Sequence, residues 1–252
     1  MARKKQTPVN FSELGGYRYL HFGSEWIQGG MLINRPWKLA LEYQQWMMSL
    51  MLFNDDPKEC LQLGLGAGGF AKFCWKYMPN THTTVVEISE EVYMASRMWF
   101  KMPDDDERLQ VVFEDCKKYL KEDAPALRPD WLLVDIYDAD CWGPVYDDVP
   151  FYRLCRKCLS ENGFATFNVF GGVDFLHSLE QVSKAFNGRV LYTPEVQEGN
   201  RILIAAAGPK RTWHLSTLKE KAKAIKAQYK LPADKWVNGL QKENNLTEEF
   251  IF

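Results

Sequence analysis

Short apolar runs alternate with amphipathic segments between residues 59 and 207. The apolar runs are rich in Val, Leu and Ile, and the segments between them carry apolar residues at helical spacing. Near-continuous apolar strands that alternate with helices are typical of a parallel sheet covered on both faces. The pattern predicts five parallel strands, at 60–65, 83–88, 109–113, 131–136 and 164–169.

Two final apolar runs, 188–196 and 201–207, are joined by only four residues. A connection this short joins antiparallel neighbours, because a parallel crossover needs about a dozen residues or more. We therefore expect an α/β fold: a Rossmann-like, seven-stranded, mostly parallel sheet with a terminal antiparallel hairpin. This sheet is typical of nucleoside-dependent transferases of the class I S-adenosylmethionine-dependent methyltransferase type, and it disfavours an all-parallel dinucleotide fold.

The local character of the sequence divides the chain into four parts. The polar, basic start predicts a flexible N-terminal tail over 1–16. Short aromatic runs followed by a helical pattern predict a small β-strand and helix appendage over 17–55. We expect the Rossmann-like, nucleoside-binding catalytic domain over 56–209 and a C-terminal helical tail with a Lys-rich, solvated helix over 210–252.

Composition and charge exclude several classes of partner. The net charge of −2 provides no overall field that would attract nucleic acid or a membrane surface, and no apolar run approaches the ~20 residues of a transmembrane helix. Six scattered cysteines predict free thiols in a reducing cytosol, hence a cytoplasmic protein. Cys155 and Cys158 lie in a helical pattern without a second pair, so we predict no metal requirement.

A glycine-rich turn follows the first predicted strand. Gly64, Gly66 and Gly69 satisfy G-x-G-x-x-G, and Gly68 lies in the same turn. Glycines let the backbone approach a ligand that side chains would exclude. Glu87 ends the next predicted strand, where a carboxylate can accept hydrogen bonds from both ribose hydroxyls. This combination fits NAD as well as a sulfonium nucleoside.

Three further acids follow predicted strands. Asp115 comes after the third strand, where an adenine amino group would lie, and Asp135 and Asp138 lie at the end of the fourth. The carboxyl ends of parallel strands meet at one edge of the sheet, so we expect these acids to share a site with Glu87. Two of them would repel a pyrophosphate and attract a cation. The pattern therefore favours a sulfonium nucleoside over NAD.

In their order and spacing these elements resemble the spermidine synthase (polyamine aminopropyltransferase) family over roughly residues 17–207. The matching pieces are IQGG, EYQQWM, GLGAGG, VVEI, EDCKKYL, VDIYDAD followed by GP, and LSENGFATFN. The family transfers an aminopropyl group from decarboxylated S-adenosylmethionine to an amine such as putrescine and releases methylthioadenosine. The resemblance implies the same activity here, with decarboxylated S-adenosylmethionine as co-substrate, a small polyamine as acceptor and a homodimer.

The resemblance also implies a role for each matching residue. Glu87 would hold the ribose and Asp115 the adenine. Asp135, the first aspartate of the family's D-x-x-D motif, would accept a proton from the attacking amine, and Asp138, the second, would help to bind the amine chain. The turn that cradles the nucleoside would consist of Gly64, Gly66 and Gly68, and the substrate cleft would be lined by Tyr43, Gln44 and Gln28.

Several positions depart from the family's pattern. Ala67 stands where the family has an aspartate that contacts the propylamine end of the donor. Val196 stands where an aromatic residue is usual, and Ile136 and Tyr137 stand where small hydroxyl residues are usual. These departures leave two alternatives open: a methyltransferase that uses intact S-adenosylmethionine and a non-catalytic nucleoside-binding protein. A third, an NAD-dependent oxidoreductase, rests only on G-x-G-x-x-G and Glu87, and the predicted terminal hairpin counts against it.

Overall fold

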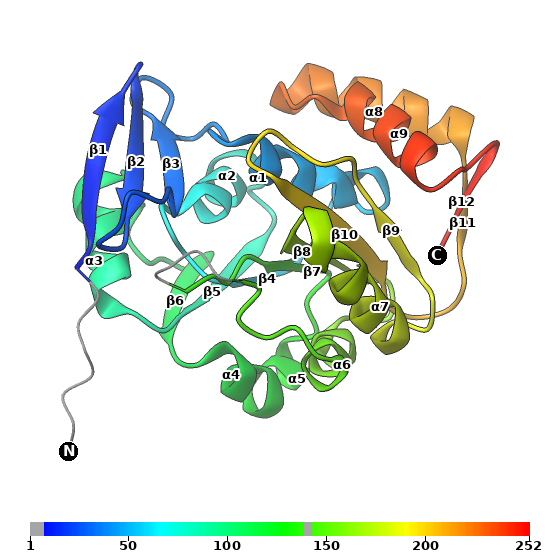
Figure 1. Ribbon diagram of the computed structural model, residues 1–252, viewed down its shortest axis with the longest axis horizontal. Coiled ribbons are helices and arrows are strands. Elements are labelled where there is room, and N and C mark those ends of the chain that lie inside the picture. The colour runs from blue at the N-terminus through cyan, green and yellow to red at the C-terminus, as the bar shows by residue number, and fades with distance from the viewer. Residues whose placement is uncertain (1–7, 139–142) are drawn as a thin grey trace.

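The computed structural model describes residues 8–138 and 143–252, and a seven-stranded sheet lies at its centre (Figure 1). Its strands are β4 (Glu59–Leu63), β5 (His82–Glu87), β6 (Leu109–Phe113), β7 (Trp131–Val134), β8 (Phe164–Phe170), β9 (Val190–Tyr192) and β10 (Asn200–Ala206). In the order β6-β5-β4-β7-β8-β10-β9 the first five strands are parallel, and β10 is antiparallel to both of its neighbours. The predicted α/β fold and its terminal hairpin are confirmed.

Helices cover both faces of this sheet. One face carries α1 (Glu42–Met47), the 3₁₀ helix η1 (Met48–Leu52), α2 (Gly69–Tyr77) and α3 (Glu90–Trp99). The other carries α4 (Cys116–Glu122), α5 (Ala124–Leu127), α6 (Val149–Cys158) and α7 (Phe175–Ala185), the last preceded by the short η2 (Gly172–Asp174). Successive strand residues point to opposite faces, so Leu132 packs among α6 and α7 whereas Leu133 packs among α1 and η1. Burial on both faces explains why the strands read as continuous apolar runs.

A three-stranded antiparallel sheet forms the N-terminal appendage and lies beside α2 and α3 (Figure 1). Its strands are β1 (Asn10–Leu14), β2 (Tyr17–His21) and β3 (Gly29–Leu32). Residues 10–14 therefore form a strand, in contrast to the flexible tail expected over 1–16. The pairing of β1 with β2 and the contact of Phe11 with Trp99, at 4.9 Å between ring centroids, hold this strand in place.

The C-terminal segment belongs to the core, in contrast to the tail expected over 210–252. It contains β11 (Thr212–His214), α8 (Leu215–Tyr229), α9 (Ala233–Glu243) and β12 (Glu249–Ile251). Trp236 is fully buried in the same apolar cluster as Trp46 of α1. A Cβ at Gly239 would lie 2.6 Å from the Trp46 ring, so glycine allows α9 to pack directly on α1. The predicted helix is present, and its apolar face supplies part of the main core.

The described cysteines, Cys60, Cys74, Cys116, Cys155 and Cys158, are free thiols, and Cys141 lies outside the described residues. Cys155 and Cys158 lie on α6, as their spacing predicted. Within residues 8–138 and 143–252 no three His, Cys, Asp or Glu side chains are grouped so as to hold a metal ion. None of the helices in this part of the chain combines the length and the apolarity that a membrane span requires.

Candidate active site

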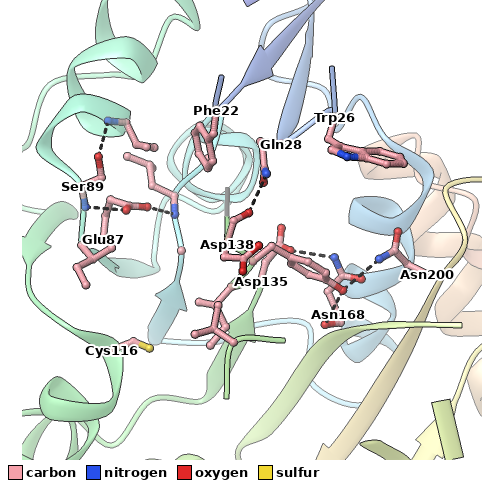
Figure 2. Close-up of a pocket in the computed structure, with 18 of the residues that line it drawn as sticks. Phe22, Trp26, Gln28, Glu87, Ser89, Cys116, Asp135, Asp138, Asn168 and Asn200 are labelled. Atoms are coloured by element: carbon pink, nitrogen blue, oxygen red, sulfur yellow. Dashed lines mark hydrogen bonds between the residues drawn. The ribbon is translucent and has the colours of Figure 1, made fainter. Parts of the chain in front are cut away.

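A cavity of 1190 Å³ lies at the carboxyl ends of the parallel strands, where the predicted acids converge (Figure 2). Among the described residues that line it, eight are acidic and none is Lys, Arg or His. The acids are Glu25, Glu87, Glu114, Asp115, Asp135, Asp138, Asp174 and Glu198. Carboxylates of like charge in one enclosed space attract cations and repel anions, so the charge of this cavity favours a cationic ligand over an anionic one.

Asp135 follows β7 and is held at the centre of the cavity by two side-chain donors. The Tyr43 hydroxyl donates to Oδ2 at 3.0 Å, and Asn168 Nδ2 donates to Oδ1 at 2.9 Å. Burial raises the pKa of Asp135, and the hydrogen bonds from Asn168 and Tyr43 oppose that rise. A fixed carboxylate with a raised pKa is a stronger base than an exposed aspartate.

The glycine turn brings the ends of β4 and β7 together. Gly64 has φ +89°, and a Cβ there would lie 2.1 Å from the backbone oxygen of Asp135, so only glycine fits. Gly66, with φ +52°, would place a Cβ 3.2 Å from the backbone oxygen of Gln28. Both glycines line the cavity and shape its floor.

Glu87 is oriented by backbone donors at the end of β5. Its Oε2 accepts from Leu65 N at 3.0 Å, and its Oε1 accepts from Ser89 N at 2.9 Å (Figure 2). Burial raises the pKa of Glu87, and the backbone hydrogen bonds from Leu65 and Ser89 act in the opposite direction. Its position on the cavity wall places a preoriented carboxylate beside the glycine turn.

Asp115 both caps a helix and faces the cavity. Its Oδ1 accepts from Lys118 N at the start of α4, and its Oδ2 accepts from the Tyr146 hydroxyl at 2.8 Å. This hydrogen bond and burial raise the pKa of Tyr146 to about 12, so Tyr146 remains a donor at neutral pH. The helix cap sets the direction of the Asp115 side chain.

The structure brings together most, but not all, of the predicted site residues. Asp138 and Gln28 line the cavity, and Gln28 Nε2 donates to the backbone oxygen of Asp138 at 2.9 Å. Gln44 is buried and its Oε1 accepts from Leu41 N, so it supports the start of α1 and does not line the cavity. Gly68 is the N-cap of α2, and a Cβ there would meet Met102 Sδ at 2.8 Å; it too lies outside the lining.

Sequence reasoning did not find several residues of this site. Asn168 lies inside the apolar run of β8, where an isolated amide was the available signal. Asn200 Nδ2 donates to the Tyr137 hydroxyl at 3.2 Å, and that hydroxyl donates to the backbone oxygen of Asn168 at 3.2 Å. Glu198, on the hairpin loop, completes the acidic wall. The two hydrogen bonds of its hydroxyl make Tyr137 a fixed part of the cavity lining.

Removal of the Tyr43 hydroxyl tests its effect on Asp135. The Tyr43 hydrogen bond lowers the pKa of Asp135, so Tyr43→Phe should raise it and move the acid limb of kcat to higher pH. The lost hydrogen bond, worth roughly 1 kcal/mol, also holds Asp135 in position, so we expect a rate about fivefold lower at neutral pH. Tyr17→Phe, on β2 and outside the cavity, is the matched control in a pH–rate profile. An acid limb that moves equally in both variants contradicts the assignment.

Comparison with known proteins identifies the family of the chain. Residues 40–188 match the family described as Spermine/spermidine synthase domain. The polyamine aminopropyltransferase of Neisseria meningitidis serogroup A is 32% identical over 238 residues, which cover 94% of this chain and 90% of that protein. The chain belongs to the spermine/spermidine synthase family.

Solved structures show the same fold at lower identity. A probable spermidine synthase from Corynebacterium glutamicum has a TM-score of 0.71 at 19% identity, with coverage of 94% of this chain and 92% of that one. Human methyltransferase-like protein 13 in complex with SAH has a TM-score of 0.68 at 20% identity, with coverage of 76% and 93%. A probable spermidine synthase and a methyltransferase-like protein therefore both have this fold, so the fold alone does not separate the two chemistries and the residues that line the cavity must do so.

Two of the positions that depart from the spermine/spermidine synthase pattern, Ala67 and Val196, are buried outside the cavity. Ala67 is buried in the cluster that contains Leu20 and Phe100, and a Cβ at Gly29 would lie 3.0 Å from its methyl group. Ala67 does not line the cavity, whose acids come from other positions. Val196 is buried in the main core, and its backbone N–H closes the hairpin loop onto Asn200.

Proposed function

We propose that this protein transfers an aminopropyl group from decarboxylated S-adenosylmethionine to a small polyamine and releases methylthioadenosine. The observation that carries the proposal is the acidic cavity: eight carboxylates face it, without a basic side chain among the described lining residues, in a chain of the spermine/spermidine synthase family. The transferase has two cationic substrates, a sulfonium and an ammonium. An acidic cavity lowers the electrostatic cost of bringing them together.

The nucleoside half of the donor would lie over the glycine turn. Glu87, held by two backbone donors, would accept hydrogen bonds from the ribose hydroxyls. Asp115 would accept a hydrogen bond from the adenine amino group. Gly64 and Gly66, both with positive φ, form the turn over which the nucleoside would lie.

Asp135 would act as the base in the transfer step. A protonated amine has no free electron pair, so the acceptor nitrogen must lose a proton to Asp135 before or as it attacks. The nitrogen then forms a bond to the propyl carbon beside the sulfonium, and the carbon–sulfur bond breaks. Its electron pair stays on sulfur, which becomes the neutral thioether of methylthioadenosine. Tyr43 and Asn168 would hold Asp135 at the required angle.

The acceptor chain would extend from Asp135 toward Asp138 and the hairpin. Gln28 positions the backbone at Asp138, and Tyr137, fixed by its hydrogen bond to the Asn168 backbone, also lines the cavity. We propose Tyr43, Asp138 and Gln28 as substrate-binding residues, and we assign Gln44 and Gly68 to support of the elements that carry the site. We further propose that the protein acts in the cytoplasm, as a homodimer, without a metal ion.

The charge of the cavity predicts which donor is used. Intact S-adenosylmethionine carries a carboxylate that the decarboxylated donor lacks, and every charged side chain in the described lining has the same negative sign. Two like charges about 6 Å apart, at an effective dielectric constant near 20, repel by about 3 kcal/mol, or roughly 100-fold. We expect decarboxylated S-adenosylmethionine to be preferred by about that factor in kcat/KM.

Product analysis by mass spectrometry tests the proposal. The protein is given each donor separately, with a mixture of diamines and polyamines. The expected products are methylthioadenosine and an amine heavier by one aminopropyl unit, which also names the acceptor. S-adenosylhomocysteine with a methylated amine would show a methyltransferase instead. Binding of methylthioadenosine without any product would show a nucleoside-binding protein that lacks turnover.

A further inference from the structure

A second cavity, of 490 Å³, lies at the opposite end of the sheet from the candidate active site. It is bounded by the C-terminal ends of α6 and α7 and by the loop before β8. Phe164, the first residue of β8, adjoins this end, whereas Phe170, the last, lines the active-site cavity. Seven residues of strand span roughly 20 Å, so the two cavities are separate sites.

The second cavity is basic. Among the described residues that line it, the charged ones are one acid, Glu161, and four cations: Arg128, Arg153, Arg156 and Lys157. Among the described residues none of these four cations forms an ion pair: each lacks a carboxylate oxygen within 4.0 Å. The charged residues that line this cavity therefore carry a net positive charge.

Two further arginines, Arg189 and Arg211, lie close to this group of cations. Arg189 has buried Nε and Nη2 atoms that lack a hydrogen-bond partner within the described part of the chain. Burial and repulsion by Arg156 lower the pKa of Arg189. Burial and repulsion by Arg189 in turn lower the pKa of Arg211. Neither arginine lines the cavity, so Arg189 adds positive potential beside Arg156 rather than a hydrogen bond to a ligand.

Helix geometry accounts for only part of this cluster. Arg156 and Lys157 lie in the last turn of α6, where cations interact favourably with the helix dipole, and Arg156 Nη1 donates to the backbone oxygen of Ala185 at the end of α7. Arg153 lies in the middle of α6, and Arg128 is the C-cap of the four-residue α5. Neither of these two arginines serves an α6 or α7 terminus, yet both face the cavity.

We propose that this cavity binds a small polyanion with two or more linked phosphate groups. Guanidinium groups match phosphate oxygens with paired hydrogen bonds, and four cations around one concave space exceed what a single phosphate needs. The volume of 490 Å³ suits a small molecule. The basic residues surround a concavity rather than an extended face, which favours a small ligand over nucleic acid. The proposal is independent of aminopropyl transfer.

Calorimetric titration of the 252-residue protein with sodium tripolyphosphate, at constant ionic strength, tests the proposal. We expect saturable one-to-one binding that weakens at least tenfold in the double variant Arg153→Gln and Lys157→Gln, whose side chains are exposed and outside the core. The matched control is Lys219→Gln with Lys235→Gln, two exposed lysines on α8 and α9. The control should bind as the parent does.

Absence of saturable binding, or equal weakening in both double variants, overturns the proposal. ATP and adenosine serve as further probes, which distinguish a free polyphosphate ligand from a nucleotide. Equal affinity for ATP and tripolyphosphate indicates recognition of the phosphates alone, and tighter ATP binding indicates a nucleotide. Adenosine reports on the proposed nucleoside site in the first cavity, so its binding should be unchanged in the variant Arg153→Gln with Lys157→Gln. If adenosine binds and tripolyphosphate does not, the protein is intact and the second cavity is not a phosphate site. Loss of transferase activity in any variant does not bear on this result.

Discussion

Asp135→Asn is expected to lower turnover by roughly 10²–10⁴-fold, the range that a positioned general base contributes. The asparagine keeps the shape of Asp135: its oxygen can accept from Asn168 Nδ2, and its amide can donate to the Tyr43 hydroxyl. It cannot accept a proton from the amine. Affinity for methylthioadenosine should stay within about twofold, because Glu87 and Asp115 are unchanged.

Steady-state kinetics and equilibrium binding of methylthioadenosine measure the two halves of this prediction. Asp56→Asn, at an exposed aspartate paired with Lys58, is the matched control and should retain full activity. If Asp135→Asn kept near-normal turnover, another group would have to remove the proton. If it lost nucleoside affinity as well as turnover, Asp135 would contribute to binding rather than to proton transfer.

Trp236→Ala is expected to destabilise the protein by about 3–5 kcal/mol, as a large buried aromatic side chain does when it is truncated. Trp236 is fully buried on α9 and belongs to the cluster that contains Trp46 and Leu50. Its removal leaves a cavity where α9 packs on α1 and η1. Urea unfolding followed by circular dichroism gives the change in unfolding free energy.

Lys235→Ala is the neighbouring control on the same helix, at an exposed position, and should change the unfolding free energy by less than about 0.5 kcal/mol. A small effect of Trp236→Ala would mean that α8 and α9 are dispensable for the stability of the sheet. A large effect would mean that residues 210–252 fold as one unit with the rest of the chain. We expect the large effect because the cluster includes residues of β4, β7, β8 and β10.

The strands and the terminal hairpin followed from the sequence because their signals are local. A strand buried on both faces must be apolar along its length, and a four-residue connection cannot cross over between parallel neighbours. The converging acids followed in the same way, since Glu87, Asp115 and Asp135 each lie at or just beyond the end of a strand and parallel strands end at one edge. The resemblance then attached a chemical role to each of them.

Tertiary packing decided the features that the sequence left open. Phe11, Trp236 and Gly239 owe their positions to partners far along the chain, so the ends of the protein were expected to be tails although they carry a strand and part of the core. Gln44 and Tyr43 are adjacent in sequence, yet one supports a helix end and the other reaches Asp135, because neighbouring helical residues point in directions about 100° apart.

The second cavity shows the same limit most clearly. Its cations come from the loop after α5 and from α6, and the buried guanidinium behind them follows α7. Arg153, Arg156 and Lys157 share one helix at i, i+3 and i+4, but no spacing along the chain links them to Arg128 or Arg189. Local pattern determined the sheet, its order of elements and the acids at its edge. Long-range packing alone decided which distant side chains meet, because contact between them depends on how the layers close on one another.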